Sequence, residues 1–393
     1  MDRVTRIPHV PLAPFTELLG DIVAENSISA ADSHWDHSNE RVIDILQGWF
    51  DRLGFNTQIQ DVDPLKGKYN LIATLGSGPG GLVLAGHTDT VPFDESRWST
   101  DPFKLHFEQE KLFGLGSCDM KGFFPIIVEA LRGLEGAELI QPLIVIATAD
   151  EESSMAGART LAEGSSFQAR AAVIGEPTSI KPIRMHKGIM MESVQFHGCS
   201  GHSSNPALGQ STVEAVHGFL GEILAYRSRL QSQYQNANFL VSGPTLNVGA
   251  IHGGDSPNRI CGHCQLNFDL RPLPGMSIES LHAEIKALVQ QTGYQHAIEV
   301  THKSMVKPVP AFETPASSEL VKICERLTDT KAQAVAFATE APFLSGMGMD
   351  TVVMGAGSID QAHQPNEFLA TEQVRGMADV LRSLIQNYCI AAS

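Results

Sequence analysis

The chain has 393 residues, of which 42% are hydrophobic and 18% charged, a composition typical of a globular enzyme with a large core. Its formal net charge of −16 at pH 7 argues against binding to nucleic acid or anionic membranes, because both favour basic surfaces. No apolar run is long enough to cross a bilayer, no secretory signal is recognisable and the six cysteines are scattered, so we expect a cytoplasmic protein.

The first part of the chain alternates helical and strand patterns. Apolar residues recur at helical spacing over 38–54, and a second helix is expected over 124–134. Short apolar runs bounded by glycine or proline predict buried strands at 70–75, 81–85, 142–148 and 171–175. This order favours an α/β fold with a mostly parallel sheet. Polar residues follow three of these strands, and we expect them to meet at one edge of the sheet.

The pattern changes at about residue 189 and returns to α/β at about residue 302. The intervening segment predicts strands at 189–197, 245–251 and 260–270 and helices at 211–230 and 278–291. Two helices among roughly four strands, three of which are located here, suggest a small α+β domain with the two helices on a four-stranded antiparallel sheet. The last part predicts helices at 317–327 and 371–388 around a strand at 351–354. We therefore predict a discontinuous catalytic domain, residues 1–188 and 301–393, with a smaller domain inserted at 189–300.

Several polar residues next to these strands have the chemistry of metal ligands. His87 and Asp89 follow one strand, where residues two apart project to the same side. The imidazole could bind a metal while the carboxylate orients it, although such a triplet is also common by chance. The glycines of segment 114–122 would present Asp119 on a tight loop. Its carboxylate could bridge two metals or cap the following helix.

Asp150, Glu151 and Glu152 follow another expected strand directly. Three adjacent carboxylates repel one another unless a cation neutralises them, and one could bind metal while its neighbour serves as a general base. A solvated acidic turn is the alternative. Glu176 and His363 are unremarkable individually, and spacing alone does not join them to the others. Two zinc-like ions that share a bridging carboxylate would nevertheless need ligands of these types: His87, Asp119, Glu152, Glu176 and His363.

Taken together, these motifs resemble those of the two-zinc aminoacylase and carboxypeptidase-like metallohydrolases. The resemblance covers essentially the whole chain, in order, through the motifs at 87–92, 119–122, 150–152 and 175–177. Longer strings resemble one branch of that family, which removes the acetyl group from N2-acetyl-L-ornithine; they lie at 97–103, 186–188, 251–255, 269–275, 339–343 and 361–367.

The resemblance implies a two-zinc centre in each subunit, in which cobalt can substitute. Asp119 would bridge the ions, His87 and Glu176 would hold the first, and Glu152 and His363 the second. The proton-transferring base would be Glu151, and Asp89 would orient His87.

Further implied residues would contact the substrate. His202 of the inserted domain would stabilise the oxyanion in the partner subunit's site of a homodimer, although it could also be a surface-loop histidine. Asn258 and Arg271 would bind the α-carboxylate, and Glu340 the side-chain ammonium. The inserted domain would thus serve in dimerisation or as a lid.

The implied reaction yields L-ornithine and acetate in arginine biosynthesis. Another deacylase of the family, such as a succinyl-diaminopimelate desuccinylase, or a dipeptidase would share the metal ligands. A binding protein without activity would be expected to lose Glu151 or a ligand, and none is lost. Cys261 and Cys264 form a single Cys-x-x-Cys motif in an expected strand, where we expect packed thiols rather than a metal or redox site.

Overall fold

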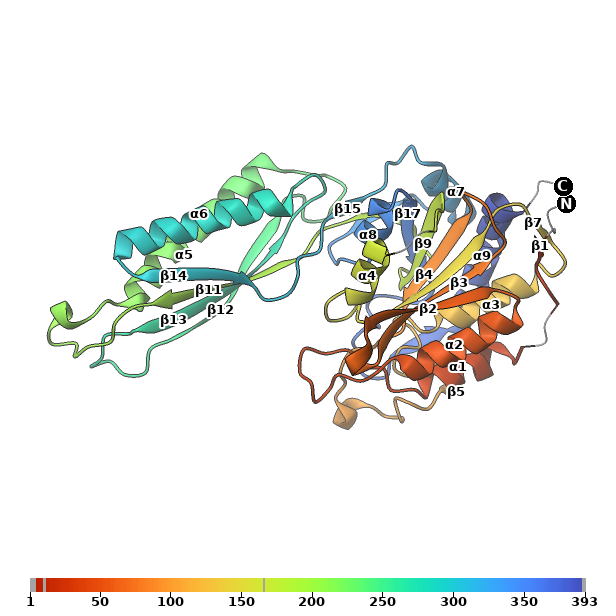
Figure 1. Cartoon of the computed structure of the whole chain (residues 1–393), viewed down its shortest axis with the longest axis horizontal. Helices are drawn as coiled ribbons and strands as arrows, with labels where there is room; N and C mark the ends of the chain where they lie inside the picture. The colour runs from red at the N-terminus through yellow and green to blue at the C-terminus, as the bar shows by residue number, and fades with distance from the viewer. Residues whose placement is uncertain (1–4, 10–11, 165–166, 391–393) are drawn as a thin grey trace. The chain divides into compact units, whose positions relative to one another are not determined.

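The structure is a computed structural model that describes residues 5–9, 12–164 and 167–390. The described residues form two compact units (Figure 1). The first contains the residues up to Arg184, Thr314–Gln333 and those from Thr339 onward, and the second contains Met185–Glu313 with Ala334–Ala338. Within the described ranges, every helix is too short or too polar to cross a bilayer.

The first unit is built on a mixed sheet, of which strand β15 and parts of β10 and β16 belong to the chain segments of the second unit. Its strands are β2 (Asn56–Asp63), β3 (Lys68–Leu75), β4 (Leu82–His87), β8 (Leu143–Thr148), β9 (Ala171–Pro177), β10 (Ile183–His186), β15 (Phe312–Glu313), β16 (Gln333–Val335) and β17 (Asp350–Gly355). The strand order is β15-β10-β17-β9-β4-β8-β3-β2, and β16 also pairs with β10. Neighbours from β17 to β8 run parallel, whereas β3 is antiparallel to β8 and β2 to β3. The expected α/β class is confirmed, and the sheet is parallel in its centre and antiparallel towards both edges.

The central strands are apolar along their whole length because helices cover both faces of the sheet (Figure 1). One face packs against α1 (Phe15–Val23), α2 (Glu40–Arg52), α3 (Phe123–Arg132), α7 (Glu319–Thr328) and α9 (Thr371–Cys389). Leu143, Val145 and Ala147 of β8 join this core, while the alternating Ile144 and Ile146 are buried on the other side. On that side α4 (Ala156–Gly164) contacts β2 and β3, and α8 (Ala341–Gly346) contacts β17.

Small elements complete the first unit. Strand β1 (Thr5–Arg6) pairs with β7 (Glu138–Leu139), and two short 3-10 helices lie at Pro64–Lys66 and Glu95–Arg97. A three-stranded sheet joins β5 (His106–Glu108), β6 (Lys111–Phe113) and β18 (Phe368–Ala370). Because β6 leads into the loop of Asp119 and β18 follows the segment of His363, their pairing holds these two distant segments together.

The second unit is a four-stranded antiparallel sheet with two helices on one face (Figure 1). Its elements are β11 (Met190–His197), β12 (Thr245–Gly253), β13 (His263–Arg271), β14 (Glu299–Ser304), α5 (Thr212–Gln233) and α6 (Ile278–His296), with a 3-10 turn at Pro206–Leu208. The strand order is β12-β13-β11-β14. Every second residue of β13 is buried, among them Leu266 and Phe268, which pack with the helices. The expected α+β architecture is therefore confirmed, but β13 begins after Cys261, so the prediction that Cys261 lies in a strand is wrong.

Candidate metal centre

Three neighbouring parallel strands carry polar residues to one edge of the sheet. Strand β4 lies between β8 and β9. His87 is the last residue of β4, Glu176 lies near the end of β9, and the acidic turn 150–152 follows β8. Ligand atoms of His87, Asp119 and Glu152 lie within 4.8 Å of one another, and so do those of His87, Glu151 and Glu176. The expectation that these strand ends converge is confirmed.

His87 is buried, and its two ring nitrogens have different partners. Nδ1 lies 3.0 Å from the main-chain oxygen of Asp89 and 3.6 Å from that residue's carboxylate. A carbonyl oxygen only accepts, so Nδ1 carries a hydrogen, and Nε2 is the nitrogen that faces the cluster and that a metal would bind once it is deprotonated. Nε2 faces Asp119 Oδ1 at 3.2 Å and Glu176 Oε1 at 3.9 Å. The ring is therefore oriented for metal binding mainly by the backbone of Asp89, with the carboxylate farther away.

The carboxylate of Asp89 instead holds the acidic turn. Its two oxygens accept hydrogen bonds from the backbone amides of Glu151, at 3.2 Å, and Glu152, at 3.0 Å. Burial raises the pKa of Asp89 to about 6, although the charge of His87 opposes this shift. Asp150 adopts a φ of 57°, a left-handed conformation that surrounding contacts must maintain. The acidic turn is thus part-buried and tied down, which excludes the alternative of a freely solvated turn.

Asp119 is held by a carboxylate that sequence reasoning did not single out. Glu367 is buried and accepts three backbone hydrogen bonds, from Gly116 at 3.0 Å, Cys118 at 2.7 Å and Asp119 itself at 2.9 Å. Burial raises the pKa of Glu367 to about 8, against the effect of these hydrogen bonds. The N-cap of α3 is Gly122, so the alternative that Asp119 caps this helix is wrong. The only sequence signal for Glu367 was its place in the string 361–367.

The two oxygens of Asp119 face two different histidines. Oδ1 lies 3.2 Å from His87 Nε2, and Oδ2 lies 3.5 Å from His363 Nε2. His363 Nε2 is also 3.0 Å from Glu152 Oε1. A carboxylate shared between two nitrogen ligands is the arrangement that a bridged two-metal centre requires. The donor set therefore fits a pair of divalent cations, and Glu151 lies close enough for either a ligand or a base.

The electrostatics of the cluster favour cations. Burial raises the pKa values of Glu151 and Glu176 well above the ordinary range, and their carboxylate neighbours add to the effect. Burial lowers the pKa of His87, but the contact with Asp119 and the nearby carboxylates outweigh it and raise the pKa well above its usual value. The hydrogen bond to Glu152 raises the pKa of His363 to about 9. Without metal, the clustered carboxylates and histidines retain protons because these protons offset the concentrated negative charge. Metal ions would replace the protons in that role.

Glu340 is the one expected substrate contact that belongs to the same unit. Its side chain is buried, and Oε2 accepts a hydrogen bond from Thr148 Oγ1 at 2.9 Å. Within the described residues Oε1 has no hydrogen-bond partner. Burial raises the pKa of Glu340 to about 7. A buried carboxylate with one oxygen that lacks a hydrogen-bond partner has the chemistry to bind a cation. The expected contact of Glu340 with a substrate ammonium stays a prediction.

The remaining expected residues lie in the second unit. His202 Nδ1 is 2.7 Å from Ser204 Oγ, and the backbone amide of Ser203 donates to the carbonyl oxygen of Asn258 at 3.1 Å. The loops that carry His202 and Asn258 are therefore adjacent. Arg271, at the end of β13, pairs with Asp269 at 2.8 Å. The catalytic or binding roles expected for these residues stay predictions.

The cysteine pair is separate from this centre. Cys261 and Cys264 are free thiols whose sulfur atoms lie 3.5 Å apart, both in contact with Thr212 Oγ1 at 3.2 Å. Neither thiol belongs to a group of potential metal ligands found in the described part of the chain.

Comparison with known proteins gives matches along nearly the whole chain. The model of peptidase family M20/M25/M40 matches residues 83–387. Acetylornithine deacetylase of Proteus mirabilis (strain HI4320) is 44% identical over 387 residues, which cover 98% of this chain and 99% of that protein. Acetylornithine deacetylase of Klebsiella pneumoniae (strain 342) is 45% identical over 378 residues, covering 96% and 98%. These matches confirm the resemblance expected from the motifs.

Solved structures show the same fold at low identity. Aminopeptidase PepT from Bacillus cereus superposes with a TM-score of 0.75 at 18% identity, over 96% of this chain and 98% of that one. A dinuclear metal-binding peptidase of the M20 family from Bacillus subtilis has a TM-score of 0.65 at 15% identity, over 94% and 96%.

Proton release tests whether this cluster binds metal. The pKa of His363 is about 9 and the pKa of His87 is raised well above its usual value, so both rings hold protons more strongly than a free histidine, and metal binding requires them neutral. Zinc binding should therefore release protons from these ligands, and the apparent affinity should rise with pH through the pKa of His363 at about 9.

Calorimetry in two buffers with different ionisation enthalpies measures the released protons. The variant His363→Asn serves as the matched comparison and should release about one proton fewer. A binding heat that is the same in both buffers, or no binding at all, would contradict the electrostatic account of the cluster.

Proposed function

Since this chain belongs to peptidase family M20/M25/M40, we propose that it hydrolyses N2-acetyl-L-ornithine to L-ornithine and acetate. The observation that carries the proposal is the match of about 44% identity to acetylornithine deacetylases over nearly the full length of both chains. The reaction class is that of a metal-dependent amidohydrolase, which fits the intact cluster of histidines and carboxylates. Through this reaction the chain would serve arginine biosynthesis.

We propose zinc as the resident metal, with two ions per subunit and cobalt as a substitute. Asp119 would contact both ions, because its two oxygens point to different histidines. His87 and Glu176 would hold one ion, and Glu152 and His363 the other. Such ions lower the pKa of water and polarise the amide carbonyl.

Glu151 is the proposed proton carrier. Its backbone amide is fixed by Asp89, at 3.2 Å, and its carboxyl group is buried next to Glu176. Burial raises the pKa of Glu151, which brings this carboxylate closer to the basicity that a general base needs at neutral pH. Glu151 would take a proton from the attacking water and deliver it to the departing nitrogen. The second proton of that water would also pass to the nitrogen, so the products are acetate and the ammonium form of ornithine.

The second unit is assigned the role of substrate binding and dimerisation. We propose that residues 189–300 form this domain of a cytoplasmic homodimer and that His202 stabilises the oxyanion in the partner subunit's site. Support for a shared binding surface comes from the adjacent loops of His202 and Asn258. Arg271 is the cation proposed for the substrate α-carboxylate, and Glu340 the anion proposed for its side-chain ammonium.

A substrate panel tests the proposed specificity. Zinc-loaded protein should hydrolyse N2-acetyl-L-ornithine with a kcat/KM at least about tenfold above that for N-succinyl-diaminopimelate or a dipeptide, since one matched charge contact contributes roughly this factor. The panel compares purified protein with metal-stripped protein as its control. A higher kcat/KM for the succinylated substrate or the dipeptide would transfer the assignment to a desuccinylase or a dipeptidase.

The adjacent glutamates should separate into a base and a ligand. Glu151→Gln should keep both metal ions and lower kcat by about 10²-fold or more, the scale of lost general-base catalysis. Glu152→Gln should instead weaken binding of the ion next to His363. Metal analysis of both variants, with turnover measured at saturating zinc, decides the roles. If Glu151→Gln loses metal while Glu152→Gln retains it, the two roles are reversed.

Mixed dimers test the position of His202. His202→Ala and Glu151→Gln should each be nearly inactive as homodimers, but a heterodimer can combine the intact histidine of one subunit with the intact base of the other. Refolding the two variants together should recover activity in about half of the sites of each heterodimer. Mixing without subunit exchange is the control and should recover none. Inactive heterodimers of verified composition would refute a role for His202 across the interface.

A further inference from the structure

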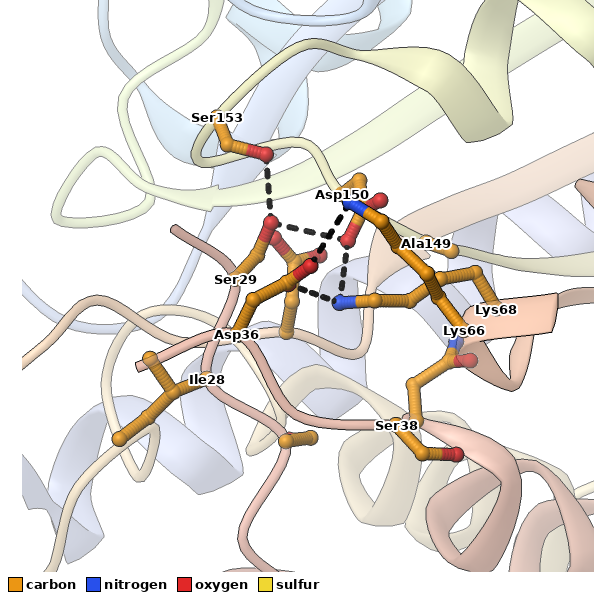
Figure 2. Close-up of polar contacts among 12 residues, drawn as sticks. Ile28, Ser29, Asp36, Ser38, Lys66, Lys68, Ala149, Asp150 and Ser153 are labelled. Atoms are coloured by element: carbon orange, nitrogen blue, oxygen red, sulfur yellow. Dashed lines mark hydrogen bonds and ion pairs between the residues drawn. The ribbon is translucent and has the colours of Figure 1, made fainter. Parts of the chain in front are cut away.

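Lys68 is a buried lysine at the start of β3 that the proposed catalytic steps do not use. Its side chain is only 1% exposed, and Nζ lies 2.7 Å from Asp36 Oδ1 and 2.7 Å from Asp150 Oδ1 (Figure 2). Burial lowers the pKa of Lys68, but the two carboxylates outweigh burial and raise it, so the ammonium stays charged. A buried charge is tolerated only when it is paired, and here one cation joins two distant segments of the chain.

One of its partners, Asp150, directly precedes the proposed base. Asp150 Oδ1 also accepts a hydrogen bond from Ser29 Oγ at 2.8 Å, and Ser29 Oγ lies 2.5 Å from Ser153 Oγ (Figure 2). Contacts to the side chains of Asp150 and Ser153 therefore hold both ends of the turn that contains Glu151. The backbone amides of Glu151 and Glu152 are held separately by the carboxylate of Asp89.

The conformation of Asp150 makes these contacts necessary. Its φ of 57° lies in the left-handed region, which aspartate tolerates better than most residues but does not prefer. Such a conformation persists where the surroundings determine it. If the side chain of Asp150 were released, the backbone could relax, and the direction of the next residue, Glu151, would change with it.

Asp36 anchors the lysine and also provides a matched comparison. Its Oδ2 pairs with Lys66 Nζ at 3.1 Å, but the side chain of Lys66 is 58% exposed. Lys66 and Lys68 thus pair with the same carboxylate, in the same segment of the chain, and within the described residues Lys68 alone of the two also pairs with Asp150. A contribution to general stability through Asp36 would be shared by both lysines, whereas an effect on the turn would belong to Lys68 alone.

We propose that Lys68 is a positioning residue for amide hydrolysis: anchored by Asp36, its ammonium holds the carboxylate of Asp150 and thereby keeps Glu151 directed at the reacting water. The proposal rests on the proposed function, since it assigns to Glu151 the role of base. It adds a buried ion-pair network behind the metal cluster, with no atom of Lys68 touching the substrate.

Kinetics of zinc-loaded Lys68→Met and Lys66→Met test the proposal. Lys68→Met should lower kcat by about 10- to 100-fold, because a misdirected base costs this order of rate, while KM stays within about twofold and two ions remain bound. Lys66→Met should stay within about twofold of the unmodified protein in kcat. A purely structural role would instead lower the unfolding temperature of Lys68→Met and leave kcat unchanged at temperatures where the protein is folded.

A double variant supplies the rescue. Lys68→Met/Asp150→Asn removes the carboxylate that lost its counter-ion, and asparagine accepts both the positive φ and the hydrogen bond from Ser29. The kcat of the double variant should be at least about fivefold higher than that of Lys68→Met, because the double variant no longer carries an unpaired buried charge. Ser29→Ala, which introduces no unpaired charge, provides a second variant should Lys68→Met fail to fold, and it should lower kcat a few-fold at constant KM.

The outcomes separate this proposal from the proposed function. The variants are compared on whichever acyl amino acid the unmodified protein hydrolyses fastest, so failure with N2-acetyl-L-ornithine alone would overturn the specificity and not the role of Lys68. A crystal structure of zinc-loaded Lys68→Met shows the position of Glu151 independently of any activity measurement. The carboxylate of Glu151 should move by about 1 Å or more relative to the unmodified protein. An unmoved Glu151, a kcat within twofold of the unmodified protein, or equal losses in both lysine variants would overturn the proposal.

Discussion

Mutual repulsion among buried carboxylates is the constraint on which the site depends. Asp89, Asp119, Glu176 and Glu340 are almost fully buried near His87, the histidine at the end of a central strand. Water cannot screen these charges, so they persist only with protons or cations among them. The same repulsion that would destabilise a metal-free site becomes metal affinity, because two divalent ions neutralise several carboxylates at once. The convergence of carboxylates from three strand ends is therefore a functional feature, because it would only destabilise a core without a functional role.

Rigid support around the cluster comes largely from carboxylates that accept backbone amides. Glu367 accepts three amides of the loop that carries Asp119, and Asp89 accepts two amides of the turn that carries Glu151. Lys68 adds to this support through the side chain of Asp150, at the start of the same turn. Hydrogen bonds between a carboxylate and backbone amides are strong and directional, so they fix loops that lack regular secondary structure. The loops can then present reactive side chains with the precision that catalysis requires.

Sequence patterns predicted the parts of the structure that depend on local periodicity. Apolar runs located strands β3, β4, β8 and β9, and helical spacing located α2 to within a few residues. They did not show that β8 lies between β3 and β4, because strand order is set by tertiary packing. The resemblance brought His363 into the site, but Glu367 and Lys68 were missed. Their roles consist of contacts to residues that are distant in the sequence, such as Glu367 to Cys118 and Lys68 to Asp150, which no local spacing can reveal.

Diffraction from zinc-loaded crystals at the zinc absorption edge tests the two-metal centre most directly. The account predicts two anomalous peaks about 3.5 Å apart in each subunit, with Asp119 in contact with both and His87 and His363 on different ions. Glu151 should remain free of either ion. A single peak, two peaks without Asp119 between them, or Glu151 bound in place of Glu152 would contradict the account.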